Sequence, residues 1–380
     1  MKRINIIFIL TLLCISNACS QKENSPPIKD SNQELFKLEK VVDGIDIPWG
    51  LSFTSNNTFL VTDKKGILYH VVDGKKIVVT GTPEIILTRQ GGLLDVAVDE
   101  KFEENKRIFI TASTSSSESG SNTALYSANF LNNSLTNLKL LYKATPDSDE
   151  ERHFGGSILV SENYIYFTIG DRGNRDVNPQ DISLDGGKVY RLNLDGTVPE
   201  SNPFNNLENA KNAIWSFGHR NPQGIIKGIS DNEIWIHEHG PRGGDEINII
   251  ESPIKGGDPL KTRNYGWPKA TYGINYSGSE ITKFKTLDNV NDPFYYWTPS
   301  IAPSGMAYLD SDIYPDWNKS LLVGSLKFLY LERLEFNANG ITNREKLFPG
   351  VGRVRDVNIS PDGYIYISVE SIGIFRIIPK

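Results

Sequence analysis

The chain has 380 residues, of which 38% are hydrophobic and 10% aromatic, so it is able to bury a large core. Its 33 glycines and 20 prolines favour many turns over long helices. A net charge of −6 and the lack of any long Lys/Arg run argue against a general affinity for nucleic acid.

The N-terminus has the pattern of an export signal. Met1–Arg3 carries two cations, residues 4–15 form a mainly apolar run, and small residues precede Cys19. This order predicts a lipoprotein-type signal peptide over residues 1–19, with Cys19 as the lipid-bearing first residue of the mature chain. The rival interpretations are an uncleaved anchor, for which the apolar run is short, and a plain signal peptide cleaved elsewhere. We expect an exported protein that meets the membrane only through its lipid, at the periplasm or the cell surface.

The remaining N-terminal residues differ in composition from the rest of the chain. Residues 20–34 are polar and contain the pair Pro26-Pro27, which predicts a flexible tether between the lipid and a folded body over residues 35–380. Both cysteines, Cys14 and Cys19, precede that body, so it must be stable without disulfides.

A three-strand pattern recurs six times in the body. In each copy a small residue opens a short apolar strand, and a second strand rich in aromatic and β-branched residues and an alternating third strand follow. The openings lie at Gly50, Gly92, Gly156, Gly224, Gly305 and Asp356. Six such units predict an all-β fold, a six-bladed β-propeller with four-stranded antiparallel blades, in which residues 36–41 complete the last blade. The alternative is a β-sandwich or a two-domain all-β protein.

Propeller geometry predicts that polar residues from distant segments meet at one end of the channel. Blade strands run up and down around this channel, so the entry to a first strand and the exit from a second strand share a rim. The residues at such positions are Gln90, His153, Arg220, Asn221, Arg353 and Arg355 before first strands, and Gly240, Pro241 and Lys327 after second strands. We expect them to form a site at one channel mouth.

This predicted set is cationic and holds no activated Ser or Cys nucleophile. Four cations gathered in an acidic protein favour a polyanionic ligand, since collecting them without one would cost on the order of several kcal/mol. His153, which is close to two glycines in the sequence, suits a general base, although a lone histidine is more often structural.

Oxygen ligands for a hard cation occur nearby. Gly240-Pro241 offers carbonyls, and Glu246 and Tyr265 offer further oxygens, for a calcium-type ion, whereas the other interpretation is a turn with solvated charges. His237 and His239 share a strand face and leave zinc open. Trp297 is an aromatic surface that is suited either to stacking on a flat ligand or to the core.

Seven runs occur in the order that is typical of one known family. They are Gln90–Leu94, His153 ahead of Gly170–Gly173, Gly218–Gly224, Gly240-Pro241 with Asp245–Asn248, Asn264–Pro268, Ser325–Lys327 and Arg353–Asp356. On these runs, over roughly residues 36–378, the chain resembles the soluble glucose/sorbosone dehydrogenases, and within them the aldose sugar dehydrogenases that use pyrroloquinoline quinone (PQQ).

The resemblance implies a six-bladed propeller with PQQ over the channel mouth. By motif match, the residues that would contact PQQ are Lys327, Arg353 and Arg355 at its three carboxylates, Gln90 and Asn221 as hydrogen-bonding partners, and Trp297 along the cofactor or substrate side. The carbonyls of Gly240 and Pro241 would bind the calcium that polarises the quinone, and Glu246 with Tyr265 would hold a second, structural calcium.

The resemblance also implies the reaction. His153 would remove the proton of the anomeric hydroxyl while hydride passes from C1 of an aldose to C5 of the quinone, and Arg220 would stabilise the negative charge on the quinone oxygen. The product would be a lactone, and a separate acceptor, a quinone or a redox protein, would take the electrons. We expect a monomer or a homodimer.

Three positions depart from the family pattern, namely Phe294 in place of a tyrosine and Arg152 and Arg172 in place of an acid and an amide near the base. These changes are expected to alter the substrate pocket, so a preference for glucose does not follow. Two other functions stay open. A calcium-dependent propeller lactonase or other hydrolase would need acidic ligands in the channel, and a non-catalytic binding propeller would keep the fold without turnover.

Overall fold

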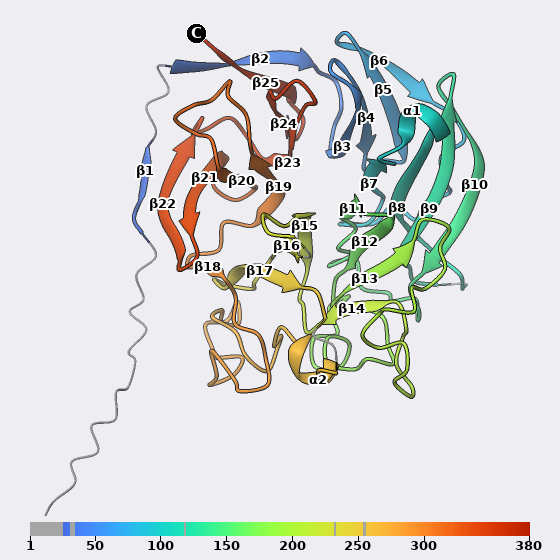
Figure 1. Cartoon of the computed structure of the whole chain (residues 1–380), viewed down its shortest axis with the longest axis vertical. Helices are drawn as coiled ribbons and strands as arrows, with labels where there is room; N and C mark the ends of the chain where they lie inside the picture. The colour runs from blue at the N-terminus through green and yellow to red at the C-terminus, as the bar shows by residue number, and fades with distance from the viewer. Residues whose placement is uncertain (1–25, 31–34, 118, 232, 254–255) are drawn as a thin grey trace, which may run out of the picture.

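The computed structural model describes residues 26–30 and 35–380, apart from residues 118, 232 and 254–255. The predicted signal peptide, with Cys19, lies outside the described residues, as does most of the predicted tether. The described residues form six β-sheets arranged as a ring, with the strands numbered in chain order (Figure 1).

Each of the first four blades is a continuous stretch of chain. Blade 1 consists of β3 (Pro48–Ser55), β4 (Thr58–Asp63), β5 (Ile67–Val72) and β6 (Lys75–Val79). Blade 2 consists of β7 (Leu93–Val98), β8 (Arg107–Thr114), β9 (Asn122–Leu131) and β10 (Ser134–Lys143). Blade 3 consists of β11 (Ile158–Ser161), β12 (Tyr164–Ile169), β13 (Lys188–Asn193) and β14 (Ile214–Phe217). Blade 4 consists of β15 (Pro222–Lys227), β16 (Glu233–Glu238), β17 (Asp245–Glu251) and β18 (Tyr295–Trp297).

The last two blades each recruit an N-terminal strand. Blade 5 consists of β19 (Pro303–Leu309), β20 (Ser320–Ser325), β21 (Tyr330–Asn337), β22 (Gly340–Leu347) and β1 (Ile28–Asp30). Blade 6 consists of β23 (Val354–Ile359), β24 (Ile365–Val369), β25 (Gly373–Pro379) and β2 (Phe36–Val42). The predicted six-bladed propeller with four-stranded antiparallel blades is therefore confirmed, and the strand β1 is an addition to it.

The two helices are short. α1 (Phe102–Asn105) and α2 (Pro259–Thr262) have four residues each and lie in connections between strands. Within the described ranges, no helix has the length and apolar content needed to cross a membrane.

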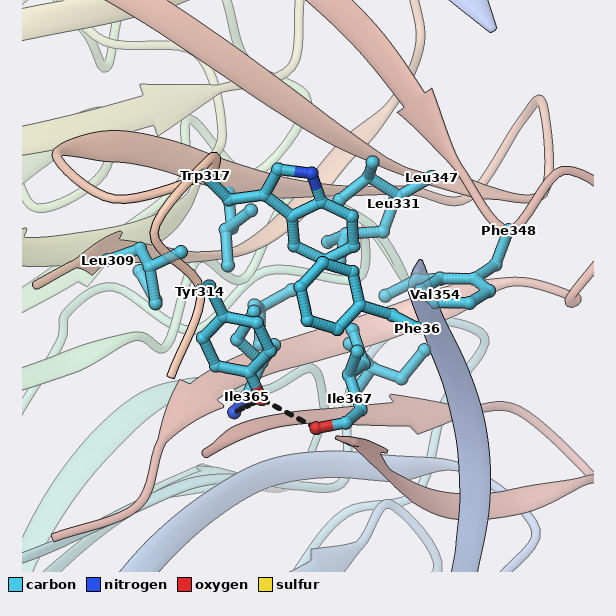
Figure 2. Packing of buried hydrophobic residues seen from close by; sticks show 14 of the residues in the cluster. Phe36, Leu309, Tyr314, Trp317, Leu331, Leu347, Phe348, Val354, Ile365 and Ile367 are labelled. Carbon is cyan, nitrogen blue, oxygen red and sulfur yellow. Dashed lines mark hydrogen bonds between the residues drawn. The ribbon is translucent and has the colours of Figure 1, made fainter. Parts of the chain in front are cut away.

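The ring is closed by β2, as the sequence predicts. β2 pairs antiparallel with β25, so that Phe36 lies opposite Pro379 and Lys40 opposite Phe375. The Phe36 ring lies 4.2 Å from the Trp317 ring, measured between centroids, inside the apolar core shared by blades 5 and 6 (Figure 2). The N-terminal strand is thus fixed both by its backbone and by its side chain.

Part of the segment predicted as a tether has regular structure. β1 pairs in parallel with β22, with Ile28 opposite Arg344 and Asp30 opposite Lys346. Blade 5 therefore has five strands, and the chain follows the outer edge of this blade before it enters blade 6.

Neighbouring blades are joined by side chains at one recurring position, the fifth residue of the second strand. Thr62 donates to the carbonyl of Leu94, Thr111 to that of Gly156, and Thr168 to that of Pro222. His237 takes this position in blade 4 and contacts the carbonyl of Gly305 at 3.2 Å. Each of these bonds runs to the first strand of the next blade or, for Gly156, to the residues just before it, and holds the innermost strands around the channel.

Candidate active site

One mouth of the channel holds a cavity of about 790 Å³, which is a suitable size for a cofactor and a small substrate. The starts of first strands and the ends of second strands form its walls, as propeller geometry predicts. The predicted site residues that line it are Gln90, Asn221, Pro241, Lys327, Arg353 and Arg355.

His153 lies beside this cavity with a fixed ring. Its backbone N–H donates to Oε1 of Gln90 (2.7 Å), and its Nδ1 lies 2.7 Å from Oδ1 of Asp171. The other oxygen of Asp171 accepts a bond from Nε1 of Trp267 (2.9 Å). Because an ionised carboxylate only accepts, Nδ1 carries the proton and Nε2 keeps its lone pair for a substrate.

The electrostatics favour a neutral His153 beside an ionised Asp171. Burial lowers the pKa of His153, and Arg220 and Arg152 lower it further, while the bond to Asp171 acts in the opposite direction. Burial alone would raise the pKa of Asp171, but His153, Arg220 and Trp267 outweigh it and hold this pKa below its usual value. This combination is that of a general base with its orienting carboxylate.

Arg220 and Asn221 are held against the loop that follows β16. Nη1 of Arg220 donates to the carbonyls of His239 (2.9 Å) and Gly240 (2.8 Å), and the backbone N–H of His239 donates to the carbonyl of Asn221 (3.1 Å). Glu238 accepts the backbone N–H of Arg220 at 2.5 Å. These bonds bring the two runs, residues 219–221 and 238–240, face to face at the mouth.

A serine, a histidine and a glutamate lie in the order of a hydrolase triad beneath these loops. Ser216 Oγ lies 2.8 Å from Nε2 of His219, whose Nδ1 lies 2.8 Å from Oε1 of Glu238. Ser216 and His219 are 0% exposed, so a substrate cannot reach this hydroxyl. The network therefore supports the loop of Arg220 instead of acting as a nucleophile.

The cavity is cationic, as the sequence predicts. Glu370 is the one carboxylate among its described lining residues, and it binds Nε of Arg353 (2.5 Å) and Nε of Arg355 (2.9 Å). The guanidinium of Arg355 also lies 4.4 Å from the ring of Trp49. The lining cations are Lys64, Arg89, Arg242, Lys327, Arg353 and Arg355. Six cations against one carboxylate fit a ligand with several negative charges.

The structure corrects the prediction for Trp297. This side chain is 1% exposed and packs in the core of blades 4 and 5, where its ring lies 5.0 Å from that of Tyr295, so it does not line the cavity. β18 is an outer strand of its blade, and its buried side chains face the neighbouring sheet instead of the channel. Aromatic residues that do line the cavity are Trp49 and Tyr276, both of which the sequence reasoning missed, and Tyr276 is 72% exposed.

Two of the departures from the family pattern also lie away from the cavity. Arg172 is buried, donates to the carbonyls of Arg152 and Glu150, and lies 3.4 Å from the Phe154 ring. Burial lowers the pKa of Arg172 to about 10. Arg172 therefore supports the loop that carries His153 and does not line the cavity. The second departure, Phe294, packs on Trp235 (5.0 Å between ring centroids).

The predicted metal residues divide into two groups. The carbonyl of Gly240 accepts from Arg220, and its N–H donates to Asp245 (2.7 Å), whose oxygens also accept bonds from Ser300, Ile301 and Ala302. Asp245 therefore organises the loops of the mouth. The carbonyls of residues 240 and 241 remain the donor type that calcium takes at the cavity itself.

Glu246 and Tyr265 form the second group and do not line the cavity. Burial and the charge of Glu238 raise the pKa of Glu246 well above its usual value, so this carboxyl needs either a proton or a nearby cation. Tyr265 donates its hydroxyl to the carbonyl of Ile249 (2.8 Å). Across the described ranges, no group of three or more His, Cys, Asp or Glu side chains is arranged to hold a metal, so a calcium ion here would depend mainly on backbone oxygens.

The zinc alternative does not fit the two histidines. His239 bonds the carbonyl of Pro303 through Nε2 (2.7 Å), and His237 bonds that of Gly305. Burial lowers the pKa of His237 to about 4. Each ring is thus used in a contact to blade 5, and the two do not converge on one point.

A six-bladed propeller with a His–Asp pair beside a cationic cavity at one channel mouth has the layout of a propeller that binds an anionic ligand there. The chain belongs to the glucose/sorbosone dehydrogenase family, whose model matches residues 45–375. It is thereby a member of a family of sugar oxidoreductases.

Individual relatives agree with this assignment. The chain is 34% identical to the aldose sugar dehydrogenase YliI of Escherichia coli, over 98% of each chain, and 27% identical to quinoprotein glucose dehydrogenase B of Acinetobacter calcoaceticus, over 90% of this chain and 87% of the relative. The crystal structure of the soluble aldose sugar dehydrogenase of Escherichia coli in its apo-form has a TM-score of 0.84 at 33% identity, covering 91% of this chain and all of the other.

Proposed function

We propose that the protein is a PQQ-dependent aldose dehydrogenase that oxidises the C1 hydroxyl of an aldose to a lactone. The observation that carries the proposal is the His153–Asp171 pair beside a cavity lined by six cations. The family membership and the sugar dehydrogenases among the relatives support it. PQQ supplies, when bound, a quinone that accepts two electrons as hydride, together with three carboxylates for the cations.

The cavity residues have a consistent set of binding roles in this proposal. Lys327, Arg353 and Arg355 would bind the carboxylates, and Gln90 and Asn221 would bond the polar edge of the ring system. Tyr276 offers an exposed aromatic face for a planar ligand. The carbonyls of Gly240 and Pro241 would bind one calcium ion, and Glu246 with Tyr265 a second, structural one.

The proton and the hydride leave the sugar in different directions. Nε2 of His153 would accept the proton of the anomeric hydroxyl, because Asp171 keeps the proton of this ring on Nδ1. As the O1–H bond breaks, the C1 hydrogen leaves with both electrons of its bond, and the C1–O1 bond becomes the lactone carbonyl. Arg220, which lies beside the Gly240 carbonyl, would stabilise negative charge at the acceptor end of this transfer.

Reconstitution tests the proposal. The purified protein is loaded with PQQ and Ca²⁺, and cofactor uptake is followed through the tryptophan fluorescence of the protein, to which Trp49 at the cavity contributes. Dye reduction is then measured with a panel of aldoses. We expect uptake and turnover, and His153→Gln should keep uptake while kcat falls about 10²–10⁴-fold. Failure to take up PQQ would reject the proposal. Uptake without turnover on any sugar would favour a binding propeller, and hydrolysis of lactones by the cofactor-free protein would favour the hydrolase.

Export is a separate part of the proposal. The order of charge, apolar run and Cys19 in the sequence supports a lipoprotein at the periplasm or the cell surface, with electrons passing to a separate quinone or redox protein. Cys19→Ala should move the protein from the membrane fraction to the soluble fraction of its native host. Membrane retention of this variant would contradict the lipid anchor.

A further inference from the structure

Three of the cations that line the cavity form no side-chain hydrogen bond or ion pair among the described residues. The guanidinium groups of Arg89 and Arg242 form neither a hydrogen bond nor an ion pair within the part of the chain that the structure describes. The third is Lys327, whose ammonium lies 5.0 Å from the centroid of the Phe328 ring and which the proposed function assigns to a carboxylate of PQQ. The remaining lining cations have partners. Arg353 and Arg355 share Glu370, and the ammonium of Lys64 donates to the carbonyls of Thr88 and Arg89 (2.9 and 3.0 Å).

The backbone at both positions is held in place. The carbonyl of Arg89 accepts the bond from Lys64, and the backbone of Arg242 exchanges two hydrogen bonds with that of Ile274, each 3.2 Å long. Two exposed guanidinium groups are therefore carried on fixed loops, while their side chains keep the freedom to reach a ligand.

In the sequence, each of the two arginines is close to a residue that positions a proposed catalytic group. Arg89 precedes Gln90, which holds the backbone of His153, and Arg242 follows Gly240-Pro241, where the Gly240 carbonyl holds Arg220. A group that contacts both arginines lies in the cavity that Gln90 also lines, and Gln90 accepts the backbone N–H of His153.

The cofactor of the proposed function does not account for these charges. Its three carboxylates match Lys327, Arg353 and Arg355, so Arg89 and Arg242 remain as positive charges over and above those that it requires. We propose that Arg89 and Arg242 bind an anionic group at the end of the sugar remote from C1, so that the preferred substrates are acidic aldoses carrying a carboxylate or a phosphate. This inference rests on the proposed function. Arg152 is not part of this subsite, since it pairs with Glu150 (3.2 Å).

Matched sugars test the inference on the protein loaded with PQQ and Ca²⁺. Glucose is compared with glucuronate and with glucose 6-phosphate, and galactose with galacturonate, so that the carboxylate and the phosphate are separate arms. We expect kcat/KM for at least one class of acidic sugar to exceed that of its neutral counterpart about tenfold or more at low ionic strength, mainly through a lower KM, and the ratio to fall with added salt.

Variants locate the effect. Arg89→Gln and Arg242→Gln should each bring the acidic-to-neutral ratio of kcat/KM toward one. Lys75→Gln, a matched loss of charge at an exposed position on the edge strand β6, should keep the ratio of the parent protein. Equal or lower kcat/KM for both classes of acidic sugar, or a ratio that survives in both arginine variants, would overturn the inference.

Failure of the proposed function has a different signature, namely no PQQ uptake or no turnover of any aldose, acidic or neutral. In that case binding at the subsite is measured directly, by titration of glucuronate, glucose 6-phosphate and glucose into the parent protein and into Arg242→Gln. Tighter binding of an acidic sugar by the parent alone supports the subsite, and identical binding by the two proteins refutes it.

Discussion

Three contacts fix the position of His153 and decide which of its ring nitrogens carries the proton. Gln90 holds its backbone, Asp171 holds Nδ1, and Trp267 holds the second oxygen of Asp171. The φ angle of His153, 58°, lies in the left-handed region that a non-glycine residue seldom adopts, so these contacts act on a backbone already committed to one conformation. The proposed base is therefore held in one orientation in the structure without a ligand.

Removal of the carboxylate tests this preorganisation. Asp171→Asn keeps the size of the side chain, but its amide is able to donate to Nδ1, which would place the histidine proton on Nε2, where the lone pair is required. We expect kcat to fall about 10²–10⁴-fold in dye-reduction assays with the cofactor still taken up. A variant with nearly full kcat would show that Asp171 does not set the tautomer of His153.

The pH dependence follows from the same pair. Burial, Arg220 and Arg152 lower the pKa of His153 below 6.5, so its neutral, active form predominates above that pH. We expect kcat/KM for a neutral aldose to rise with pH along an acidic limb centred below 6.5 and then to level off. Because Asp171 raises the pKa of His153, Asp171→Asn should shift this limb to lower pH. A limb centred above pH 7 in the parent protein, or one unmoved in the variant, would contradict this assignment.

At the scale of strands, the sequence predicts the fold because the same three-strand pattern recurs six times. The openings from Gly50 to Asp356 lie in the first strand of each blade or within two residues before it. The rule that mouths are built from first-strand starts and second-strand ends also places most of the cavity residues. Applied more widely, it would have found Lys64, Asp171 and Glu370, which come one or two residues after β4, β12 and β24.

Side-chain direction is where sequence reasoning fails. β18 has three residues, too few for alternation to show whether Trp297 faces the core or the cavity. Arg172 follows Asp171 at the mouth, but its φ angle of 54° and two backbone carbonyls beneath it direct the guanidinium inward. Family motifs identify positions, whereas the packing around each position decides what its side chain reaches.

The recurring fifth position of the second strand makes a prediction about these elements. The side chain of Thr111 is buried, and its hydroxyl donates to the carbonyl of Gly156, just before the next blade, and accepts the N–H of Asp95 (3.0 Å). Thr111→Val keeps the volume but leaves both backbone groups without a partner, which should lower the free energy of unfolding by about 1–3 kcal/mol. Denaturant unfolding measures this loss, with the exposed Thr136→Val as control. Equal stability of the two variants would mean that the bond between blades contributes nothing.

At the scale of the whole molecule, the acidic residues in the channel behind the mouth have a structural role. Its cavity of about 310 Å³ is lined by Asp95 and Asp356, the acidic residues that a metal-dependent hydrolase would need there. Both accept backbone N–H bonds from the next blade, Asp95 from Ile158 and Asp356 from Leu51, each at 2.8 Å. Burial raises the pKa of both carboxyls. Their oxygens join neighbouring blades around the axis, which gives both acids a structural role.

Because the mouth draws residues from every part of the ring, its geometry depends on closure by β2. Phe36 anchors this strand in the core against Trp317 and Tyr314, with 4.2 and 5.2 Å between ring centroids. Phe36→Ala should lower the free energy of unfolding by about 3–5 kcal/mol, the usual cost of emptying a buried aromatic site. Leu35→Ala, one residue earlier and 50% exposed, should change it by less than about 0.5 kcal/mol. Denaturant titration compares the two variants. If blade 6 loosens before the other blades, cofactor uptake by Phe36→Ala should weaken at denaturant concentrations below its unfolding midpoint. Equal midpoints for both variants would show that the ring closes without this side chain.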